Sequence, residues 1–438
     1  MRDRRRGPLK YALLIGVLSF CSAQAMAENI LRAPRTVTWQ DYLGINVQFD
    51  AYPPDVYQKQ MNRLDQLGLN RVRWAMEWAT LEPVQGQYNL ARLDAAMAAA
   101  NPHHYNIVAY LTGSAPFASS APAAASNSDQ YPPEDFNLFA ERMTALSQYY
   151  PQVDSWQVWN EPNITWRPLA DTKEYYKLFT LTADALRTAL PDKTIVTGGL
   201  GFYGQLLGST SNMLLDMVDL GLASQNVVAA YHPYSDYPEG DSVQDRDFLL
   251  RANEMNSALH KAGIPEVWAT EWGWSSYGGP LPVQQAAGLE TQANYTLRRL
   301  AMMSTLDYQR IFLFSLSDLD RPITPRERNY GLLDLKGEPK PVFNALRNFL
   351  RITGPTLEPD TLPPVLSVPE DLWAMPWTRP DGSHVLMAWS ESRAHLTIPG
   401  VKVATLYDPA SGRHAELADP MGVDVPLTPS LQILVWKP

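Results

Sequence analysis

The sequence predicts an α/β fold, a (β/α)8 TIM barrel followed by a small C-terminal antiparallel β-domain, on the basis of three observations. Eight short apolar runs alternate with segments of helical periodicity. This alternation implies parallel strands, because each helical crossover returns the chain to the same end of the sheet. The repeating units begin roughly 28 to 50 residues apart, a spacing that suits such a barrel. After Gly354 the chain changes to short runs typical of antiparallel strands.

The predicted barrel strands are short and mostly apolar. Residues 107–111 and 311–314 form nearly continuous apolar runs, which is typical of strands buried on both faces. The eight predicted strands are residues 43–49, 71–76, 106–111, 156–160, 194–198, 227–231, 267–270 and 310–315.

Between and after these strands, apolar side chains recur with the period of an α-helix. Each such segment is long enough to cross back over the outside of a barrel. The predicted helices are residues 55–67, 90–100, 133–149, 172–190, 211–220, 245–261, 283–304 and 339–350.

The C-terminal part begins with a proline-rich segment, residues 355–369. Asp381-Gly382 lies between two apolar runs and favours a hairpin, and Ser411-Gly412 resembles it. We therefore divide the chain into residues 1–27, a barrel over 28–354 and a small β-sandwich over 355–438. Three tryptophans of the last part, Trp373, Trp377 and Trp389, are expected in its core. Its predicted strands are residues 372–378, 384–389, 394–398, 403–407 and 431–436.

The N-terminus has the pattern of an export signal. Basic residues are followed by an apolar stretch, residues 11–20, and by Ala25-Met26-Ala27. The apolar stretch has about half of the roughly 20 residues that a membrane-spanning helix needs. We expect a cleaved signal peptide, a periplasmic or secreted protein and no stable membrane insertion after cleavage. An uncleaved N-terminal tether is the alternative.

Charge and cysteine content narrow the possible partners. Removal of residues 1–27 leaves 31 basic and 45 acidic residues, a net charge of −14, which repels nucleic acid. Cys21 is the only cysteine and lies in the segment to be removed, so we expect no internal disulfide. We also expect no cofactor and no metal site, since His103-His104 has no carboxylate or cysteine at ligand spacing. The expected protein is a monomer.

Two tryptophan-rich segments contain the candidate catalytic residues. Residues 156–163 read Trp-Gln-Val-Trp-Asn-Glu-Pro-Asn, and residues 267–274 read Val-Trp-Ala-Thr-Glu-Trp-Gly-Trp. Glu161 follows the fourth predicted strand, and Glu271 follows the seventh. A carboxylate in apolar surroundings is a candidate for a shifted pKa, and two such groups suit acid–base and nucleophilic attack on a sugar.

The Trp-Asn-Glu-Pro string and the second segment resemble the clan of retaining glycoside hydrolases that have glutamates at the ends of barrel strands 4 and 7. Within the clan, the export signal, barrel length and C-terminal β-domain are most similar to glycoside hydrolase family 39, in particular to hydrolases that accompany bacterial exopolysaccharide production. The resemblance implies that Glu161 is the acid/base and Glu271 the nucleophile. It also implies that Asn160 binds the hydroxyl beside the anomeric carbon.

Four further polar and aromatic positions are candidate substrate contacts or supports. Arg73, at the end of the second predicted strand, would favour the charged form of Glu271; an ion pair in the barrel wall is its alternative. His232 and Tyr234 follow the sixth strand and are expected to contact sugar hydroxyls or Glu271, although a histidine beside a proline is often purely structural. Trp78 follows the second strand.

Aromatic residues near strand ends are candidate platforms for sugar rings, and the expected ones are Trp78, Trp166, Tyr203 and Trp274. Trp272 is expected to be buried, because it alternates with Glu271. Where many members of the clan have a tryptophan after strand 8, this chain reads Phe314-Ser315-Leu316. Because this tryptophan is absent after strand 8, the sequence does not predict which sugar the protein binds.

The leading hypothesis is therefore a retaining, endo-acting glycoside hydrolase that cuts a neutral or mixed bacterial exopolysaccharide in the periplasm or outside the cell. A transglycosylase would use the same carboxylates with a sugar as acceptor. A non-catalytic polysaccharide-binding or assembly factor is the third possibility, and the pair of intact glutamates with Asn160 argues against it.

Overall fold

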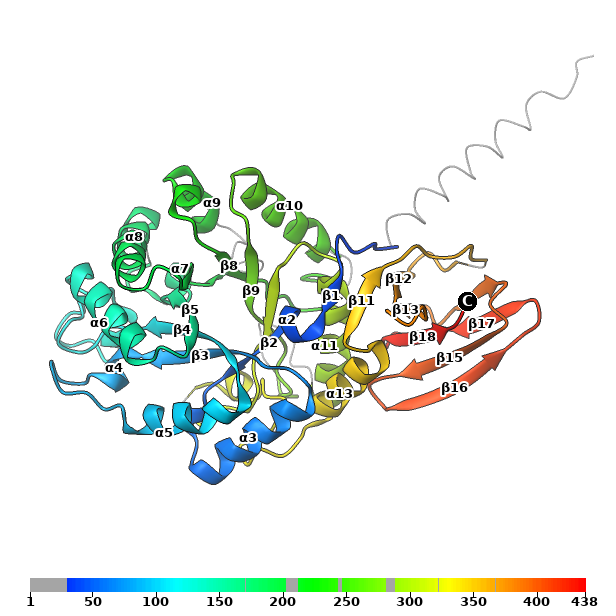
Figure 1. Cartoon of the computed structure of the whole chain (residues 1–438), viewed down its shortest axis with the longest axis horizontal. Coiled ribbons are helices and arrows are strands. Elements are labelled where there is room, and N and C mark those ends of the chain that lie inside the picture. Colours follow the sequence, from blue (N-terminus) through cyan, green and yellow to red (C-terminus); the bar gives the residue numbers. More distant parts are fainter. Residues whose placement is uncertain are drawn as a thin grey trace, which may run out of the picture. The chain divides into compact units, whose positions relative to one another are not determined.

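A computed structural model describes residues 30–169, 171–201, 212–242, 246–280, 288–321, 323–366 and 368–438. The chain divides into two compact units (Figure 1). The larger unit is Val37–Leu350. The smaller unit is Arg351–Pro438 together with the residues up to Thr36.

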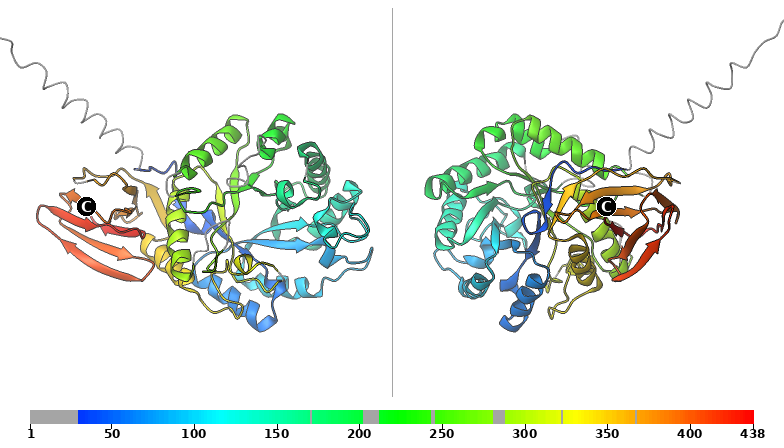
Figure 2. Two further views of the ribbon diagram at one scale, coloured as in Figure 1. Left: turned by 180° about the vertical axis from the view of Figure 1, so that it is seen from behind. Right: turned by 45° about the vertical axis from the view of Figure 1, so that its right-hand side comes forward.

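The larger unit is a closed parallel barrel (Figures 1 and 2). Its strands follow the order β6-β5-β4-β3-β2-β10-β9-β8-β7, so the first and last barrel strands, β2 and β10, are neighbours. A parallel bridge between Val196 and Val228 completes the ring on the other side. The strands are β2 (Leu43–Val47), β3 (Arg71–Glu77), β4 (Asn106–Thr112), β5 (Val153–Val158), β6 (Thr194–Val196), β7 (Leu200–Gly201), β8 (Ala229–His232), β9 (Val267–Trp272) and β10 (Arg310–Leu313).

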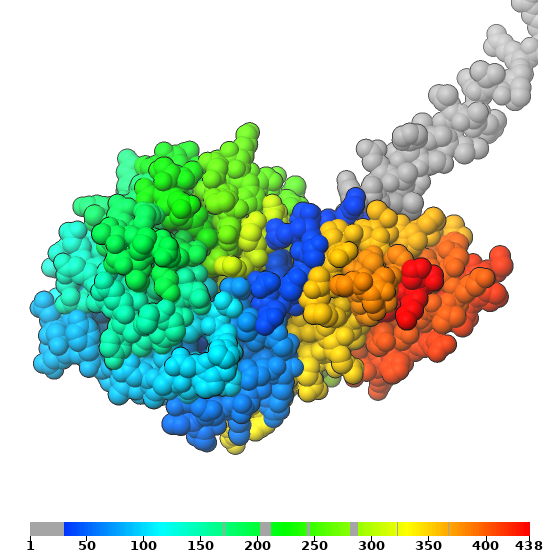
Figure 3. Space-filling model, viewed as in Figure 1, coloured from blue at the N-terminus to red at the C-terminus, as the bar shows by residue number. Residues whose placement is uncertain are grey.

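Helices cover the outside of this barrel (Figure 1), and in the space-filling view of Figure 3 the segments coloured cyan to green lie against one another on the face in view. Asp135 and Asp171 cap α6 and α8 by accepting hydrogen bonds from backbone N–H groups of the first turn. The main helices are α3 (Pro54–Gln66), α5 (Ala91–Ala100), α6 (Phe136–Tyr149), α8 (Thr172–Ala189), α9 (Met213–Asp219), α10 (Phe248–Lys261), α11 (Gly288–Ser304) and α13 (Pro341–Thr353). Short helices are α2 (Trp39–Tyr42), α4 (Trp78–Leu81), α7 (Pro162–Thr165) and α12 (Pro325–Arg328). The predicted fold class is confirmed, with β7 as a short addition.

Side chains inside the barrel form layers, because alternate residues of each strand point inward. One apolar cluster of the barrel consists of Val108, Val196, Val228, Ala230, Trp268 and Phe312. Three polar side chains of the strands, Arg73, Gln157 and Thr270, are also fully buried. The barrel strands therefore contribute both an apolar cluster and a group of buried polar side chains, and the polar ones lie behind the functional site.

The smaller unit is an antiparallel β-domain. Its main sheet has the order β11-β12-β13-β18-β15-β16, and β14 pairs with β17 in a second sheet. One apolar cluster, which includes Leu386, Ile398, Val423 and Leu434, joins residues of both sheets, so the domain is a small sandwich. The strands are β11 (Thr356–Pro359), β12 (Trp373–Thr378), β13 (His384–Trp389), β14 (His395–Pro399), β15 (Val403–Asp408), β16 (Arg413–Ala418), β17 (Gly422–Pro426) and β18 (Gln432–Trp436).

The expected hairpin at Asp381-Gly382 joins β12 and β13, with Gly382 at a φ of 79°. Trp373, Trp377 and Trp389 are buried, but they are not members of the apolar cluster of the sandwich, which contains the neighbouring residues Ala374 and Ala388. Three of its strands, β11, β16 and β17, were not predicted. In β16 nearly every side chain is exposed, so its sequence has no apolar alternation that would reveal a strand.

The N-terminal boundary also differs from the expected one. Residues 30–36 belong to the smaller unit, whereas the sequence assigned them to the barrel. The reason is local pairing: Ile30 forms a parallel bridge with Ala374, and the N–H of Leu31 donates to the carbonyl of Ala374. The predicted signal peptide lies outside the described residues. Among the described helices, none is long and apolar enough to cross a membrane.

Candidate active site

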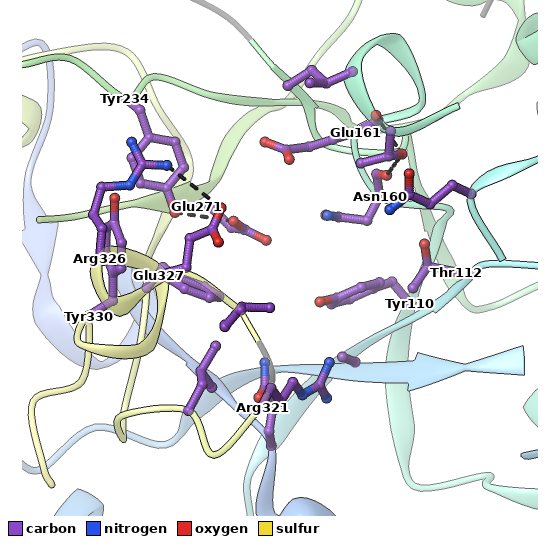
Figure 4. Close-up of a pocket in the computed structure, with 18 of the residues that line it drawn as sticks. Tyr110, Thr112, Asn160, Glu161, Tyr234, Glu271, Arg321, Arg326, Glu327 and Tyr330 are labelled. Carbon is purple, nitrogen blue, oxygen red and sulfur yellow. Dashed lines mark hydrogen bonds and ion pairs between the residues drawn. The ribbon is translucent and has the colours of Figure 1, made fainter. Parts of the chain in front are cut away.

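Two glutamates face each other over a cleft at the carboxyl ends of the barrel strands (Figure 4). Glu161 follows β5, the fourth barrel strand, and Glu271 lies in β9, the seventh. A carboxylate oxygen of each lies within 4.8 Å of the other. The cleft has a volume of about 900 Å³. This separation suits a pair of carboxyl groups that act on the same glycosidic bond with retention, for which about 5 to 5.5 Å is usual.

A sharp turn directs Glu161 into the cleft. Trp159 and Glu161 have left-handed backbone conformations, with φ of 72° and 48°, and Pro162 then begins α7. The N–H of Glu161 donates to the carbonyl of Gly198, which holds the turn against the next strand. Such conformations are strained for residues with a Cβ and concentrate at functional sites.

A bulge in β9 directs Glu271 into the same cleft. Thr270 points into the barrel, so regular alternation would turn Glu271 outward. The register between β9 and β10 shifts, however: Ile311 pairs with Ala269, but Leu313 pairs with Trp272. The additional residue of β9 allows Thr270 and Glu271 both to face inward.

Glu161 lies in surroundings that favour its protonated form. Burial raises its pKa to about 7, although the positive charge of Arg73 acts in the opposite direction. His232 contacts it, with 2.7 Å between Nδ1 and Oε1 of Glu161. The imidazole is itself fully buried, and burial lowers its pKa to about 3. His232 is therefore neutral at pH 7, and Glu161 can hold a proton there.

Glu271 has the opposite surroundings. Nη1 of Arg73 lies 2.6 Å from Oε1 of Glu271, and the Tyr234 hydroxyl donates to Oε2 over 3.1 Å. The guanidinium also donates to Asn46, Gln157 and Asn160. Two donors, one of them cationic, favour the ionised carboxylate.

Asn160 lines the cleft beside Glu161. Its Oδ1 accepts from Nη2 of Arg73 over 2.6 Å, which fixes the direction of the amide. No described residue accepts a hydrogen bond from its Nδ2. The amide nitrogen can therefore donate to a substrate hydroxyl.

Arg73 and His232 do not contact the cleft. Their side chains are fully buried, and neither is among the residues that line it. Neither is therefore placed to bind sugar directly, because both are buried behind the two glutamates. For His232 the alternative expectation, a contact with Glu271, is met, with 3.7 Å between Nδ1 and Oε2 of Glu271. The expected contact of Arg73 with Glu271 is present. Tyr234 does line the cleft and contacts Glu271.

Three of the expected aromatic platforms were also wrong, because Trp78, Trp166 and Trp274 are at most 2% exposed. Trp166 packs edge-on against Trp159. The indole of Trp274 donates to two backbone carbonyls of the loop after β8, and that of Trp78 donates to Glu82. They support the loops around the cleft. Tyr203, the fourth expected platform, lies outside the described residues.

Several cleft residues were missed by sequence reasoning. Tyr110 and Thr112 point inward from β4, and alternation along that strand would have identified them. Glu77, the last residue of β3, lines the cleft and pairs with Arg321. The segment after β10 contributes seven more, and it has no motif to mark it. They are Phe314, Leu319, Arg321, Ile323, Arg326, Glu327 and Tyr330.

One group among the described residues has ligand atoms close enough for a metal ion, namely Glu161, His232 and Glu271. Nδ1 of His232 and Oε1 of Glu161 are already bonded to each other. A metal ion there would have to displace that hydrogen bond.

The fold and site together define a class of protein, the barrel glycoside hydrolases with a pair of glutamates at the ends of strands 4 and 7. Residues 33–305 match the family model described as Cellulase (glycosyl hydrolase family 5), and the chain belongs to this family. It is thus a glycoside hydrolase, and the expected membership of the clan is confirmed. The comparison with curated proteins gives no match.

Solved structures of other glycoside hydrolases are similar in fold. A family 39 glycoside hydrolase from Bacteroides cellulosilyticus WH2 has a TM-score of 0.71 at 19% identity, over 92% of this chain and 83% of that one. A monomeric beta-xylosidase from Caulobacter crescentus CB15 has a TM-score of 0.64 at 15% identity, over 93% and 98%. A GH30 endoxylanase from Clostridium papyrosolvens C71 has a TM-score of 0.61 at 14% identity, over 93% and 99%. The likeness to the family 39 enzyme agrees with the resemblance drawn from the sequence.

Proposed function

We propose that this protein cuts within the chains of a bacterial exopolysaccharide by double displacement, with Glu161 as acid/base and Glu271 as nucleophile. The observation that carries the proposal is the pair itself. The two carboxyl groups have oxygens within 4.8 Å of each other, and their surroundings favour opposite protonation states.

In the first step the ionised Glu271 attacks the anomeric carbon, while Glu161 gives its proton to the departing glycosidic oxygen. The bond between the anomeric carbon and that oxygen breaks, and a covalent glycosyl-enzyme forms. In the second step Glu161, now a carboxylate, takes a proton from a water molecule. The water oxygen attacks the anomeric carbon, Glu271 leaves, and the anomeric configuration is retained. The Nδ2 of Asn160 would donate to the neighbouring hydroxyl throughout.

Endo action is supported by the size of the site. A second hollow of about 390 Å³ shares Glu77, Thr112, Gln130, Asn160 and Thr165 with the main cleft. A pocket for one drug-sized ligand occupies about 300 to 1,000 Å³, so the joined space accommodates several sugar rings. An exopolysaccharide substrate and export from the cytoplasm are proposed from the sequence, because of the family 39 likeness and the N-terminal signal pattern.

The test of the catalytic pair is Glu161→Gln and Glu271→Gln, assayed on aryl glycosides and on polysaccharides. We expect Glu161→Gln to lower kcat by about 10²- to 10⁴-fold, the usual contribution of one acid–base group, and Glu271→Gln, which removes the nucleophile, to lower it by at least as much. Glu239→Gln is the matched control: Glu239 is 9% exposed against 8% for Glu271, and it pairs with Arg298 as Glu271 pairs with Arg73. The control should lose stability but retain most of its activity. Full activity in either test variant would refute the assignment.

Azide separates the two roles. In Glu161→Ala, azide should attack the glycosyl-enzyme and give a glycosyl azide of retained configuration. In Glu271→Ala, azide should replace the nucleophile and give the inverted azide. The reversed pattern would exchange the roles. Oligosaccharides longer than the substrate among the wild-type products would identify transglycosylation instead of hydrolysis.

A further inference from the structure

A chain of hydrogen bonds runs behind the two glutamates inside the barrel. Nε of Arg73 lies 2.6 Å from Oε1 of Gln157. Nε2 of Gln157 lies 3.2 Å from Oγ1 of Thr270, which lies 3.0 Å from Nε2 of His232. His232 then contacts Glu161 through Nδ1. The four side chains that lead to Glu161 are Arg73, Gln157, Thr270 and His232. Each is at most 1% exposed, so water does not compete for these hydrogen bonds.

The direction of each bond follows from the chemistry of the donors. A guanidinium has no acceptor, so Oε1 of Gln157 must accept from Arg73. Its amide nitrogen must then face the other way, where it donates to the carbonyl of Thr197 over 2.7 Å and to Thr270. The orientation of the Gln157 amide is therefore determined by two independent partners.

The hydroxyl of Thr270 lies between Gln157 and His232, so the direction of one hydrogen bond determines the direction of the other. This hydroxyl accepts from Gln157 and has one hydrogen left to donate. Nε2 of His232 is the remaining hydrogen-bond partner of that hydroxyl. A buried hydroxyl that leaves its hydrogen unused loses its solvation without compensation, so Nε2 accepts and the imidazole proton resides on Nδ1.

We infer that Thr270 and Gln157 are positioning residues that hold His232 as its Nδ1–H tautomer, so that His232 donates permanently to Oε1 of Glu161 and leaves Oε2 to carry the proton for catalysis. This inference rests on the proposed function. No described residue bonds to Oε2 of Glu161, which agrees with it. The imidazole does not take up the proton in either step: it donates to Glu161 both as the acid and as the carboxylate.

Gly199 supplies independent evidence that this arrangement is tightly enclosed. A Cβ on Gly199 would lie 2.3 Å from Nε2 of His232 and 2.8 Å from Oγ1 of Thr270. Only a residue without a side chain permits that hydrogen bond in its present place.

The test is ¹⁵N-histidine NMR of the full chain at pH 7, with the His232 signals identified by their loss in His232→Gln. We expect a neutral Nδ1–H imidazole in the wild type and in Thr270→Ser, which keeps the hydroxyl. Thr270→Val, which keeps the shape without the hydroxyl, should lose the strict preference for this tautomer. A wild-type Nε2–H tautomer or an imidazolium would overturn the inference, and so would an unchanged tautomer in Thr270→Val.

Gln157→Glu provides a second variant should Thr270→Val fail to fold. A carboxylate in place of the amide would accept the Thr270 hydrogen, so the hydroxyl could only accept from His232. The tautomer should then change to Nε2–H, and retention of Nδ1–H would overturn the inference. These measurements need no substrate, so their failure is distinguishable from failure of the catalytic assignment.

The kinetic consequence separates positioning from a merely structural role. Thr270→Val should lower kcat by about 10- to 100-fold with little change in KM, and should move the limb of the pH–rate profile that reports Glu161. Thr270→Ser should restore both. A loss that appears in KM alone, or that Thr270→Ser does not reverse, would contradict the inference.

Discussion

Glu161 and Glu271 have the same side chain but lie in different surroundings. Glu161 meets a neutral imidazole and apolar surroundings, so burial raises its pKa to about 7. Glu271 accepts hydrogen bonds from a guanidinium and a phenol. Burial disfavours charge and a cationic donor favours it, so the pair divides into a proton donor and an ionised nucleophile.

The raised pKa of Glu161 leads to a prediction about stability. In the unfolded chain the carboxyl group ionises near pH 4.3 to 4.5, and in the folded chain it ionises near pH 7. The unfolded state therefore binds fewer protons between these values, and folding stability falls as pH rises through them. Glu161→Gln removes this titration. The variant should gain up to about 3 kcal/mol over the wild type between pH 5 and pH 8, as measured by denaturant unfolding of both proteins. A difference that does not change with pH would contradict the prediction.

Predictions for single residues succeeded where a motif determines the position and failed where side-chain direction matters. Glu161, Glu271 and Asn160 were predicted from two short sequence motifs, and all three line the cleft. Trp166 and Trp274 lie equally near in sequence but point into the packing behind the loops. Nearness along the chain does not reveal which side of a loop a ring will occupy. The assignment of Tyr203 stays a prediction.

At the scale of elements, irregularities in regular strands build the site. The left-handed turn after β5 and the bulge in β9 each redirect one glutamate. The segment between β6 and β7 contributes Gly198 and Gly199, which approach Glu161 and His232 closely. Each irregularity has a local backbone cost, which the surrounding barrel offsets.

Gly199→Ala tests the role of this segment. Gly199 has a φ of 59°, and the new Cβ would collide with His232, Thr270 and Gln157. Gly68→Ala is the matched control, because Gly68 has a φ of 68° and nothing within 4 Å of the new Cβ. The control should lose about 1 to 2 kcal/mol from backbone strain alone and keep its kcat. Gly199→Ala should lose more stability and also at least about tenfold in kcat, measured by unfolding and by steady-state kinetics. Equal effects in the two variants would contradict this.

The regular elements were largely predictable because their signals are local. Apolar runs and helical periodicity locate every barrel strand except β7, which is two residues long. The unpredicted strands of the smaller unit have weaker signals: β11 lies in a proline-rich segment, and β16 is almost wholly exposed. A strand is recognised from sequence only when burial imposes a pattern on it.

At the scale of the whole molecule, the cleft is made by segments that are distant in sequence. Figure 4 shows Tyr110, Thr112 and Asn160 on one side, and Tyr234, Glu271 and Tyr330 on the other. The cleft also contains charges of both signs, among them Glu77, Arg321, Arg326 and Glu327. Such a lining suits a hydroxyl-rich polymer.

The size of the cleft predicts the course of polymer degradation. Internal cuts shorten chains quickly, so the viscosity of a sensitive polysaccharide should fall early, before many new reducing ends have formed. Viscometry combined with reducing-end analysis of the same samples measures both quantities. Glu161→Gln should change neither. Release of single sugars with little loss of viscosity would show exo action and contradict the prediction.

The sequence by itself determined the order of strands and helices, the two glutamates and their strands, because periodicity and a short motif are properties of neighbouring residues. Only the tertiary structure decided which side chains reach the substrate. Closure of the barrel places Arg73, Gln157, Thr270 and His232 in one buried layer, although they come from four strands. Their hydrogen bonds span up to 113 positions of sequence. The physical reason is that side-chain direction and partners are set by packing across the barrel, which no local pattern records.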